Sequence, residues 1–142
     1  MAQSRQQARN LLVQALYQQQ LTEHEYSELV SQFEARPEFS GIDQIYFRDV
    51  LRSVLGDLEA LDRTIAELAS RSLDQLDSVG QAVLRLGLAE LHHRTDVPTK
   101  VVINEAVELA KRYGAADSYK FVNAVLDKAS KRIAERDDRA TG

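Results

Sequence analysis

The sequence predicts an all-α protein, on three observations that concern periodicity, composition and length. Apolar residues recur at helical spacing through nearly the whole chain, and no stretch alternates polar and apolar residues for long. The 142 residues include only two prolines and six glycines, so few positions interrupt a helix. This length suits one domain with a sizeable core. We therefore expect residues 1–142 to form one domain of about six or seven helices, with a frayed tail at 137–142.

The first two helices follow from capping signals and apolar stripes. Ser4 and Gln7 have capping-box spacing, so the first helix is expected to begin at Ser4. A second capping box, Thr22 with Glu25, predicts a short helix that ends before Pro37, because proline disfavours helical geometry in the preceding residue. The stripe of the first helix is made of Ala8, Leu11, Leu12, Ala15 and Leu16.

The middle of the chain predicts a long or divided helix, followed by a buried one. An apolar pattern runs from Ile45 to Leu68, and Gly56 bends or divides it. Ser78 with Gln81 then has the spacing of a third capping box. The helix that begins there carries apolar residues on most of its sides, so we expect it to be the most buried element.

The last third of the chain predicts two helices joined by a tight turn. Pro98 precedes a helix over 99–113, which Gly114 is expected to close as a left-handed cap. Asp117 or Ser118 is expected to cap the last helix. The apolar face of that helix comprises Phe121, Val122, Val125, Leu126, Ala129 and Ile133.

Polar residues within these two helices are interpreted first as structural. Asn104 and Asn123 interrupt apolar runs, and buried amides of this kind usually satisfy backbone groups or each other. Glu105 and Glu108 are followed by two cations at helical pair spacing, which predicts surface salt bridges.

The residue types exclude most catalytic and metal sites. The chain has no cysteine, which excludes disulfides, thiolate zinc sites and cysteine nucleophiles. His92 and His93 are adjacent and point about 100° apart on a helix, so they cannot chelate one ion together. No glycine-rich phosphate loop, G-x-S-x-G motif or Ser/His/Asp grouping is present. We expect a binding protein, without enzyme activity, metal or cofactor.

The N-terminus and hydropathy place the protein away from membranes. The first ten residues contain no apolar leader, and no run approaches the ~18 apolar residues that a membrane span requires. A cytoplasmic protein is the expectation.

Charge is distributed unevenly along the chain. Residues 23–77 carry a net charge of −8, whereas residues 1–22 carry +2 and residues 78–136 carry +3. One half could therefore face a polyanion while the other faces a basic partner. The alternative is an uneven but solvated surface.

Two groups of residues suit RNA. Arg5 and Arg9 lie four residues apart in the first helix, and Tyr17 follows two turns later. Guanidinium groups fork onto phosphates, and aromatic rings stack on unpaired bases. The alternative is a solvated helix face with a half-buried tyrosine.

The second group opens the last helix. Asp117 or Ser118 at the cap leaves backbone amides free for an anion, and Lys120 adds a positive charge. Phe121 is either a stacking platform or the first core residue of its helix.

Four segments resemble the NusB family of transcription antitermination factors. They are QALYQ at 14–18, IYFRDVL at 45–51, QAVLRLGLAEL at 81–91, and DVPTKVVINEAVELAKRYGAADSYKFVNAVLDK at 96–128. The resemblance implies an all-α fold of two packed helical bundles. It also implies binding of the boxA element of ribosomal RNA leader transcripts together with NusE, a small-subunit ribosomal protein. This heterodimer on RNA would help to assemble a termination-resistant RNA polymerase complex.

The resemblance assigns residues to RNA position by position. The family's N-terminal arginines fall on Arg5 and Arg9, its first-helix tyrosine on Tyr17, and the arginine of its L-R motif on Arg85. The start of the last helix completes the set with Asp117, Ser118, Lys120 and Phe121.

The chain departs from the family pattern at two places. Many relatives carry further arginines where this chain has Gln6 and Gln7, and each lost phosphate contact weakens binding and its salt dependence. Ala89 stands where an aromatic residue is common, which concerns local packing.

Partner surfaces and rival functions follow from the same features. The acidic middle segment suits a basic partner such as NusE, and the surface around helix 78–92 is the expected contact. Self-association through the acidic half would give a homodimer.

The rival functions are a helical adaptor that binds only protein, and a detached NusB-like module of a ribosomal RNA methyltransferase. The second rival needs a further nucleotide-binding domain, and the sequence stops at Gly142.

Overall fold

The part of the chain that the structure describes folds into seven α-helices and two short 3-10 helices. The computed structural model describes residues 2–70 and 72–141, with side chains described for 3–70 and 72–137, and no strand occurs in this part of the chain. The elements are α1 (Ala2–Thr22), α2 (Tyr26–Glu34), η1 (Pro37–Gly41), α3 (Gln44–Gly56), α4 (Leu58–Leu68), η2 (Leu73–Gln75), α5 (Ser78–His93), α6 (Thr99–Tyr113) and α7 (Ser118–Thr141).

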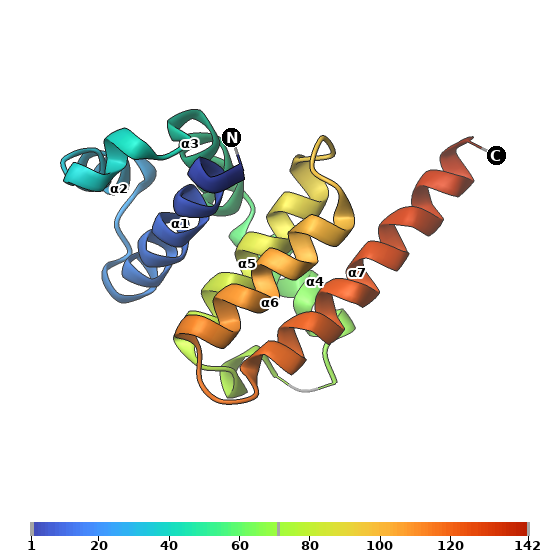
Figure 1. Ribbon diagram of the computed structural model, residues 1–142. Helices are drawn as coiled ribbons and strands as arrows, with labels where there is room; N and C mark the ends of the chain where they lie inside the picture. The colour runs from blue at the N-terminus through green and yellow to red at the C-terminus, as the bar shows by residue number, and fades with distance from the viewer. Residues whose placement is uncertain (1, 71, 142) are drawn as a thin grey trace.

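The helices form two packed bundles, as expected. Helices α1 to α3 make one bundle and helices α4 to α7 the other, and Figure 1 shows them side by side. Helix α5 packs against helices of both bundles, and a continuous cluster of buried apolar side chains runs through them. Ten of its 16 residues are buried, which confirms that the helix beginning at Ser78 is a buried centre of the fold.

The predicted helix starts are displaced where several capping residues compete. Helix α1 begins at Ala2, so Ser4 lies inside it and does not cap it. Glu25, not Thr22, precedes α2, and Glu28 Oε1 accepts a hydrogen bond from the Glu25 amide at 3.3 Å. Glu23, with φ of 57°, separates the two helices.

The same displacement occurs before α5. Asp77, not Ser78, is the N-cap, because its carboxylate accepts a hydrogen bond from the Gly80 amide at 3.1 Å. The long apolar pattern is divided at Gly56 into α3 and α4, which is one of the two outcomes, a bend or a division, that the sequence predicted.

Gly114 ends α6 but is not left-handed, which corrects the prediction. Its φ is −86°, and the left-handed residue of this turn is Asp117 with φ of 68°. Glycine is required at 114 by space, because a Cβ there would lie 2.6 Å from Ser118 Oγ and 2.8 Å from the Ala110 carbonyl oxygen. The α6–α7 connection therefore turns at an aspartate, a residue that tolerates this conformation.

Three residues expected inside the protein are exposed. Asn104 and Asn123 lie on the outward faces of α6 and α7, so the prediction of buried amides was wrong. Asn104 is two residues from buried Val102, which places it about 200° around the helix. Ile45 is 77% exposed, and its neighbour Tyr46 takes the core position instead.

Helix α7 continues to Thr141. Gly142 lies outside the described residues, so fraying of the segment 137–142 stays a prediction. None of the described helices is long and apolar enough to cross a membrane.

Candidate nucleic-acid interface

The residues predicted to bind RNA lie in three separate places. Arg5 and Arg9 lie at the junction of the two bundles, where they meet other charged side chains. Arg85 lies on α5 and faces α4. The third place is the start of α7, with the later turns of α1 nearby.

Arg9 is buried in the first of these places. Its side chain is 3% exposed, its Nε donates a hydrogen bond to Glu90 Oε1 at 2.9 Å, and its Nη2 donates one to Tyr46 Oη at 3.1 Å. Glu90 and Tyr46 are each 1% exposed. Three polar side chains from α1, α3 and α5 thus satisfy one another in the interior.

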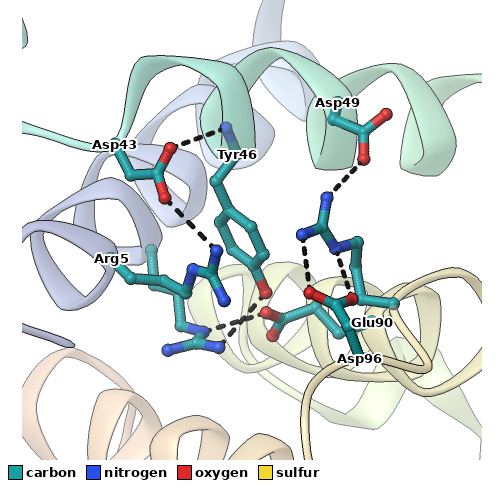
Figure 2. Close-up of polar contacts among 8 residues, drawn as sticks. Arg5, Asp43, Tyr46, Asp49, Glu90 and Asp96 are labelled. Atoms are coloured by element: carbon teal, nitrogen blue, oxygen red, sulfur yellow. Dashed lines mark hydrogen bonds and ion pairs between the residues drawn. The ribbon is translucent and has the colours of Figure 1, made fainter. Parts of the chain in front are cut away.

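Further arginines enclose this triad, as Figure 2 shows for Arg5. The guanidinium carbons of Arg5 and Arg94 lie 4.3 and 4.8 Å from the centroid of the Tyr46 ring. Arg5 Nη2 also donates to Asp43 Oδ2 at 3.4 Å, and the other Asp43 oxygen accepts from the Tyr46 amide at the start of α3. We call the group of Arg9, Glu90, Tyr46 and these flanking arginines the junction cluster.

Loop 94–98 is tied to α3 by the same cluster. Arg94 donates from Nη1 to Asp49 at 2.8 Å and from Nε and Nη2 to Asp96 at 3.0 and 2.9 Å. The dashed lines that end at the Asp49 and Asp96 carboxylates in Figure 2 mark these bonds. The cluster therefore connects the two bundles through charges as well as through apolar packing.

Burial governs the ionisation of Glu90. It raises the pKa of the Glu90 carboxyl from 4.5 to about 7, and the charge and hydrogen bond of Arg9 only partly oppose that rise. Arg5 also lowers this pKa and Glu105 raises it. Glu90 consequently exchanges its proton near neutral pH while remaining inside the protein.

These contacts separate the two N-terminal arginines. Arg9 is enclosed, so its side chain is not accessible to a ligand in this conformation. The Arg5 side chain is 32% exposed and keeps one side open to solvent. Contact of either residue with RNA stays a prediction.

The start of α7 presents one exposed charge pair above two buried side chains. Asp117 and Lys120 have side chains 75% and 66% exposed, with a Lys120 Nζ to Asp117 Oδ1 distance of 3.5 Å. Ser118 is 6% exposed and Phe121 is 8% exposed. Phe121 thus belongs mainly to the core, which is one of the two roles that the sequence allowed.

A hollow of about 270 Å³ opens beside this turn. It is lined by residues 75–77 and 115–118 and by Phe121. Ser118 Oγ and Asp77 Oδ1 are buried and lack a hydrogen-bond partner among the described residues. Two polar atoms beside the hollow are therefore buried without a hydrogen-bond partner in the described part of the chain.

Tyr17 lies toward the same end of the molecule as this turn. It is partly exposed on α1, and three residues later Gln20 Nε2 donates to the Ser78 carbonyl oxygen at 3.1 Å. Because residues 75–77 line the hollow with the α7 turn, the end of α1 and the start of α7 flank one segment, 75–78.

Arg85 stands apart from the other predicted residues. Its Nε and Nη2 form two hydrogen bonds to the carboxylate of Asp62, at 2.8 and 3.0 Å, and its side chain is 13% exposed. This paired geometry holds α5 against α4. An RNA contact of Arg85 stays a prediction.

Sequence reasoning missed a group of cations and aromatic rings near the α6–α7 turn. Tyr113 is 47% exposed, and the guanidinium carbon of Arg112 lies 5.9 Å from the centroid of its ring. Lys111 Nζ lies 5.0 Å from the ring centroid of Tyr119. The run K-R-Y at 111–113 was a readable signal, but its cations were assigned to salt bridges.

That assignment was half right. Lys111 Nζ lies 3.8 Å from Glu108 Oε1, whereas Glu105 instead accepts a hydrogen bond from Gln6 Nε2 at 3.1 Å. Across the described residues, no group of three or more histidine and acidic side chains could hold a metal ion.

The model of the NusB family matches residues 6–131 of the chain. The transcription antitermination protein NusB of Alcanivorax borkumensis is 46% identical over 138 residues, which cover 96% of this chain and 92% of that protein. The same-named protein of Yersinia enterocolitica is 46% identical over 133 residues, covering 94% of this chain and 96% of that one.

Two solved structures share the fold. T. maritima NusB superposes with a TM-score of 0.72 at 34% identity, covering 89% of each chain. A chain from the complex of antitermination factors NusB and NusE with double-stranded RNA superposes with a TM-score of 0.76 at 26% identity. That match covers 93% of this chain and 99% of the other.

Proposed function

The chain belongs to the NusB family, and from this membership we propose that it binds boxA RNA of ribosomal leader transcripts together with a NusE partner. The bound pair would help to assemble an RNA polymerase complex that resists termination, in the cytoplasm. The observation that carries this proposal is the likeness, over 93% of the chain, to a structure of NusB and NusE with RNA. The curated relatives bear the name of an antitermination protein, which supports regulation by binding and not catalysis.

The RNA-contacting surface is proposed at the start of α7 and the later turns of α1. Lys120 and Asp117 are exposed there, and the hollow next to Phe121 adjoins the first turn of α7. Tyr17 offers a partly exposed ring on the other side of segment 75–78. We propose Arg5, whose side chain is partly open to solvent at the junction cluster, as a separate RNA contact, and assign Arg9 to holding α1 in place.

The NusE partner is proposed to bind the acidic segment 23–77. Its net charge of −8 complements a basic ribosomal protein, and opposite potentials speed encounter and fix orientation. Helix α5, the contact expected from the sequence, offers little exposed surface to NusE, because most of its residues are buried. Binding shared between two proteins lets weak individual RNA contacts suffice.

A helical adaptor that binds only protein is the second candidate. It is favoured by the enclosure of Arg9 and by Gln6 and Gln7 in place of cations, which leave few exposed charges on α1. The methyltransferase-module alternative is less supported, since the matched curated relatives are covered over 92% and 96% of their own length.

Titration of labelled boxA RNA tests the proposal, with and without NusE, at two salt concentrations. We expect tighter binding of boxA than of a scrambled RNA of equal length, and stronger binding when NusE is present. Equal binding of both RNAs under every condition would contradict the proposal and favour the adaptor.

A matched pair of lysine variants tests the site. Lys120 lies in the proposed surface and pairs with Asp117, whereas Lys131 lies farther along α7 and pairs with Asp127 at 3.1 Å. Lys120→Ala is expected to weaken RNA binding and to reduce the slope of log affinity against log salt by about 1, as for one lost phosphate contact. Lys131→Ala should leave both quantities unchanged. Equal effects of the two variants would move the RNA surface elsewhere.

A further inference from the structure

Helices α4 and α7 are joined at one end and leave an open groove toward the other. At the joined end, Lys128 Nζ donates to the Leu68 carbonyl oxygen at 3.3 Å, and Arg132 Nη1 donates to Glu67 Oε2 at 2.6 Å. A hollow of about 760 Å³ then opens between the two helices and the end of α5. Figure 1 shows the last turns of α7 extending away from the other helices. We call this hollow the α4–α7 groove, and its walls come from residues 57–64, 92–93 and 129–136.

The floor of the groove is apolar and follows one face of each helix. Ala60 and Leu61 line it from α4, and Ala129 and Ile133 line it from α7. Leu61 and Ala129 are buried at the base, whereas Ala60 is exposed and Ile133 is partly exposed. A groove between two helices that exposes apolar residues at helical spacing suits a third helix that packs into it.

The α7 wall contributes two cations. Arg132 and Arg136 line the groove and lie four residues apart, so they share one face of α7. Arg136 forms no ion pair with any residue that the structure describes. Its charge reaches the end of α5, because burial first and then the charge of Arg136 lower the pKa of His92.

The carboxylates near the groove do not cancel these cations. Asp57 Oδ2 already lies 2.9 Å from His93 Nε2. Glu135 is two positions from Ile133, about 200° around α7, so it borders only the outer edge of the groove. The pair of Arg132 with Glu67 is exposed, and exposed pairs contribute little, so a carboxylate of a ligand can replace Glu67. The groove therefore presents positive charge above an apolar floor.

These features favour a protein partner over RNA. The residues that line the groove include no Phe, Tyr or Trp ring on which a base could stack. Arg132 is also separated from Lys120, in the proposed RNA surface, by about 18 Å along α7, at a rise of about 1.5 Å per residue. A basic partner such as the one proposed for the acidic segment would be repelled by the arginines.

We propose that the α4–α7 groove binds an acidic amphipathic helix of a partner protein. Carboxylates of that helix would pair with Arg132 and Arg136, and its apolar face would pack on the floor of the groove. This partner would bind beside RNA and NusE without competing with either. Its binding does not depend on the proposed RNA-binding function.

Fluorescence anisotropy of two labelled, stapled helical peptides tests the proposal. One peptide carries leucine on one face and glutamate on the other, and the second carries lysine in place of glutamate. Arg136→Glu reverses a charge inside the groove, and Ala60→Glu adds a carboxylate at an exposed position of the α4 wall. Lys131→Glu is the matched control, because Lys131 has a side chain 72% exposed on the opposite side of α7 from Ile133.

We expect the unmodified protein to bind the glutamate peptide saturably, more weakly at high salt, and to bind the lysine peptide far less. Arg136→Glu and Ala60→Glu should each weaken binding of the glutamate peptide about tenfold or more, because carboxylates then face carboxylates. Arg136→Glu should also gain affinity for the lysine peptide. Lys131→Glu should behave as the unmodified protein does, and all three variants should keep their affinities for boxA RNA and NusE.

Several results would overturn the inference. Absence of saturable binding of the glutamate peptide, or equal effects of Arg136→Glu and Lys131→Glu, would exclude the groove as its site. Weaker binding of boxA RNA by Arg136→Glu would assign the groove to RNA, and weaker binding of NusE would assign it to the NusE surface. A lack of preference for boxA in the unmodified protein would contradict the proposed function and leave this inference standing.

Discussion

Replacing Glu90 by glutamine is expected to remove a pH dependence of stability that originates in the junction cluster. The pKa of this buried carboxyl is raised from 4.5 to about 7 in the folded protein. Between these values the folded state holds a proton that the unfolded state has released. Stability from this group is therefore fully present below pH 4.5 and is lost as the pH rises through 7.

The size of the effect follows from the shift. One pKa unit corresponds to 1.36 kcal/mol, so a rise from 4.5 to about 7 corresponds to about 3 kcal/mol across the window. The slope cannot exceed about 1.4 kcal/mol per pH unit for one proton. Glutamine resembles the protonated carboxyl and does not titrate, so Glu90→Gln should lack this slope.

Urea denaturation of both proteins at pH 5, 6, 7 and 8 gives the test. The unfolding free energy of the unmodified protein minus that of Glu90→Gln should fall by about 2–3 kcal/mol between pH 5 and 8. Contributions of other titrating groups are common to both proteins and cancel in the difference.

A constant difference across this range would refute the reasoning, because it would mean that Glu90 ionises alike in both states. Carbon-13 NMR of the Glu90 carboxyl in the unmodified protein is an independent measurement. The titration midpoint of this carboxyl is expected near pH 7. A midpoint near pH 4.5 would also refute the reasoning.

Three further substitutions test the packing around the site. Arg9→Met leaves Glu90 without its cation, so urea denaturation should show that the unfolding free energy falls by about 3–5 kcal/mol at pH 8. The fall should be smaller at pH 5, where the Glu90 carboxyl is protonated. Equal losses at the two pH values would contradict the pairing. Gly87→Ala places a Cβ 2.8 Å from a buried leucine side chain of α7 and should cost about 1–3 kcal/mol. Its control Gly56→Ala meets nothing within 4 Å and should stabilise by about 0.4–1 kcal/mol, and a gain at both positions would refute the contact. Asp77→Ala removes the N-cap of α5 and should lower thermal stability by about 1 kcal/mol, whereas Asp77→Asn should keep most of it.

The helices themselves were predictable because their signals are local. Helix α6 occupies the predicted range 99–113, and Gly56 separates two helices as the pattern allowed. Helix starts were less predictable, since Ser, Thr, Asp and Glu stand close together before several helices. At α5 the structure uses Asp77 and not Ser78, a choice between neighbours that a spacing pattern cannot make.

The candidate site was predictable in its residue types and less so in its exposure. Lys120 and Asp117 are exposed, as an RNA surface requires, but Phe121 and Ser118 are buried.

By itself, the sequence determined an all-α chain, its family and the order of its helices, because helical periodicity and capping involve residues within a few positions of one another. Only the tertiary structure decided which polar groups face inward. Arg9 pairs with Glu90 across 81 positions, and Tyr46 reaches the same cluster from a third helix. Burial of a charge is tolerated only where distant segments bring its partners together. For that reason the same arginine that looked like an RNA contact holds the two bundles together.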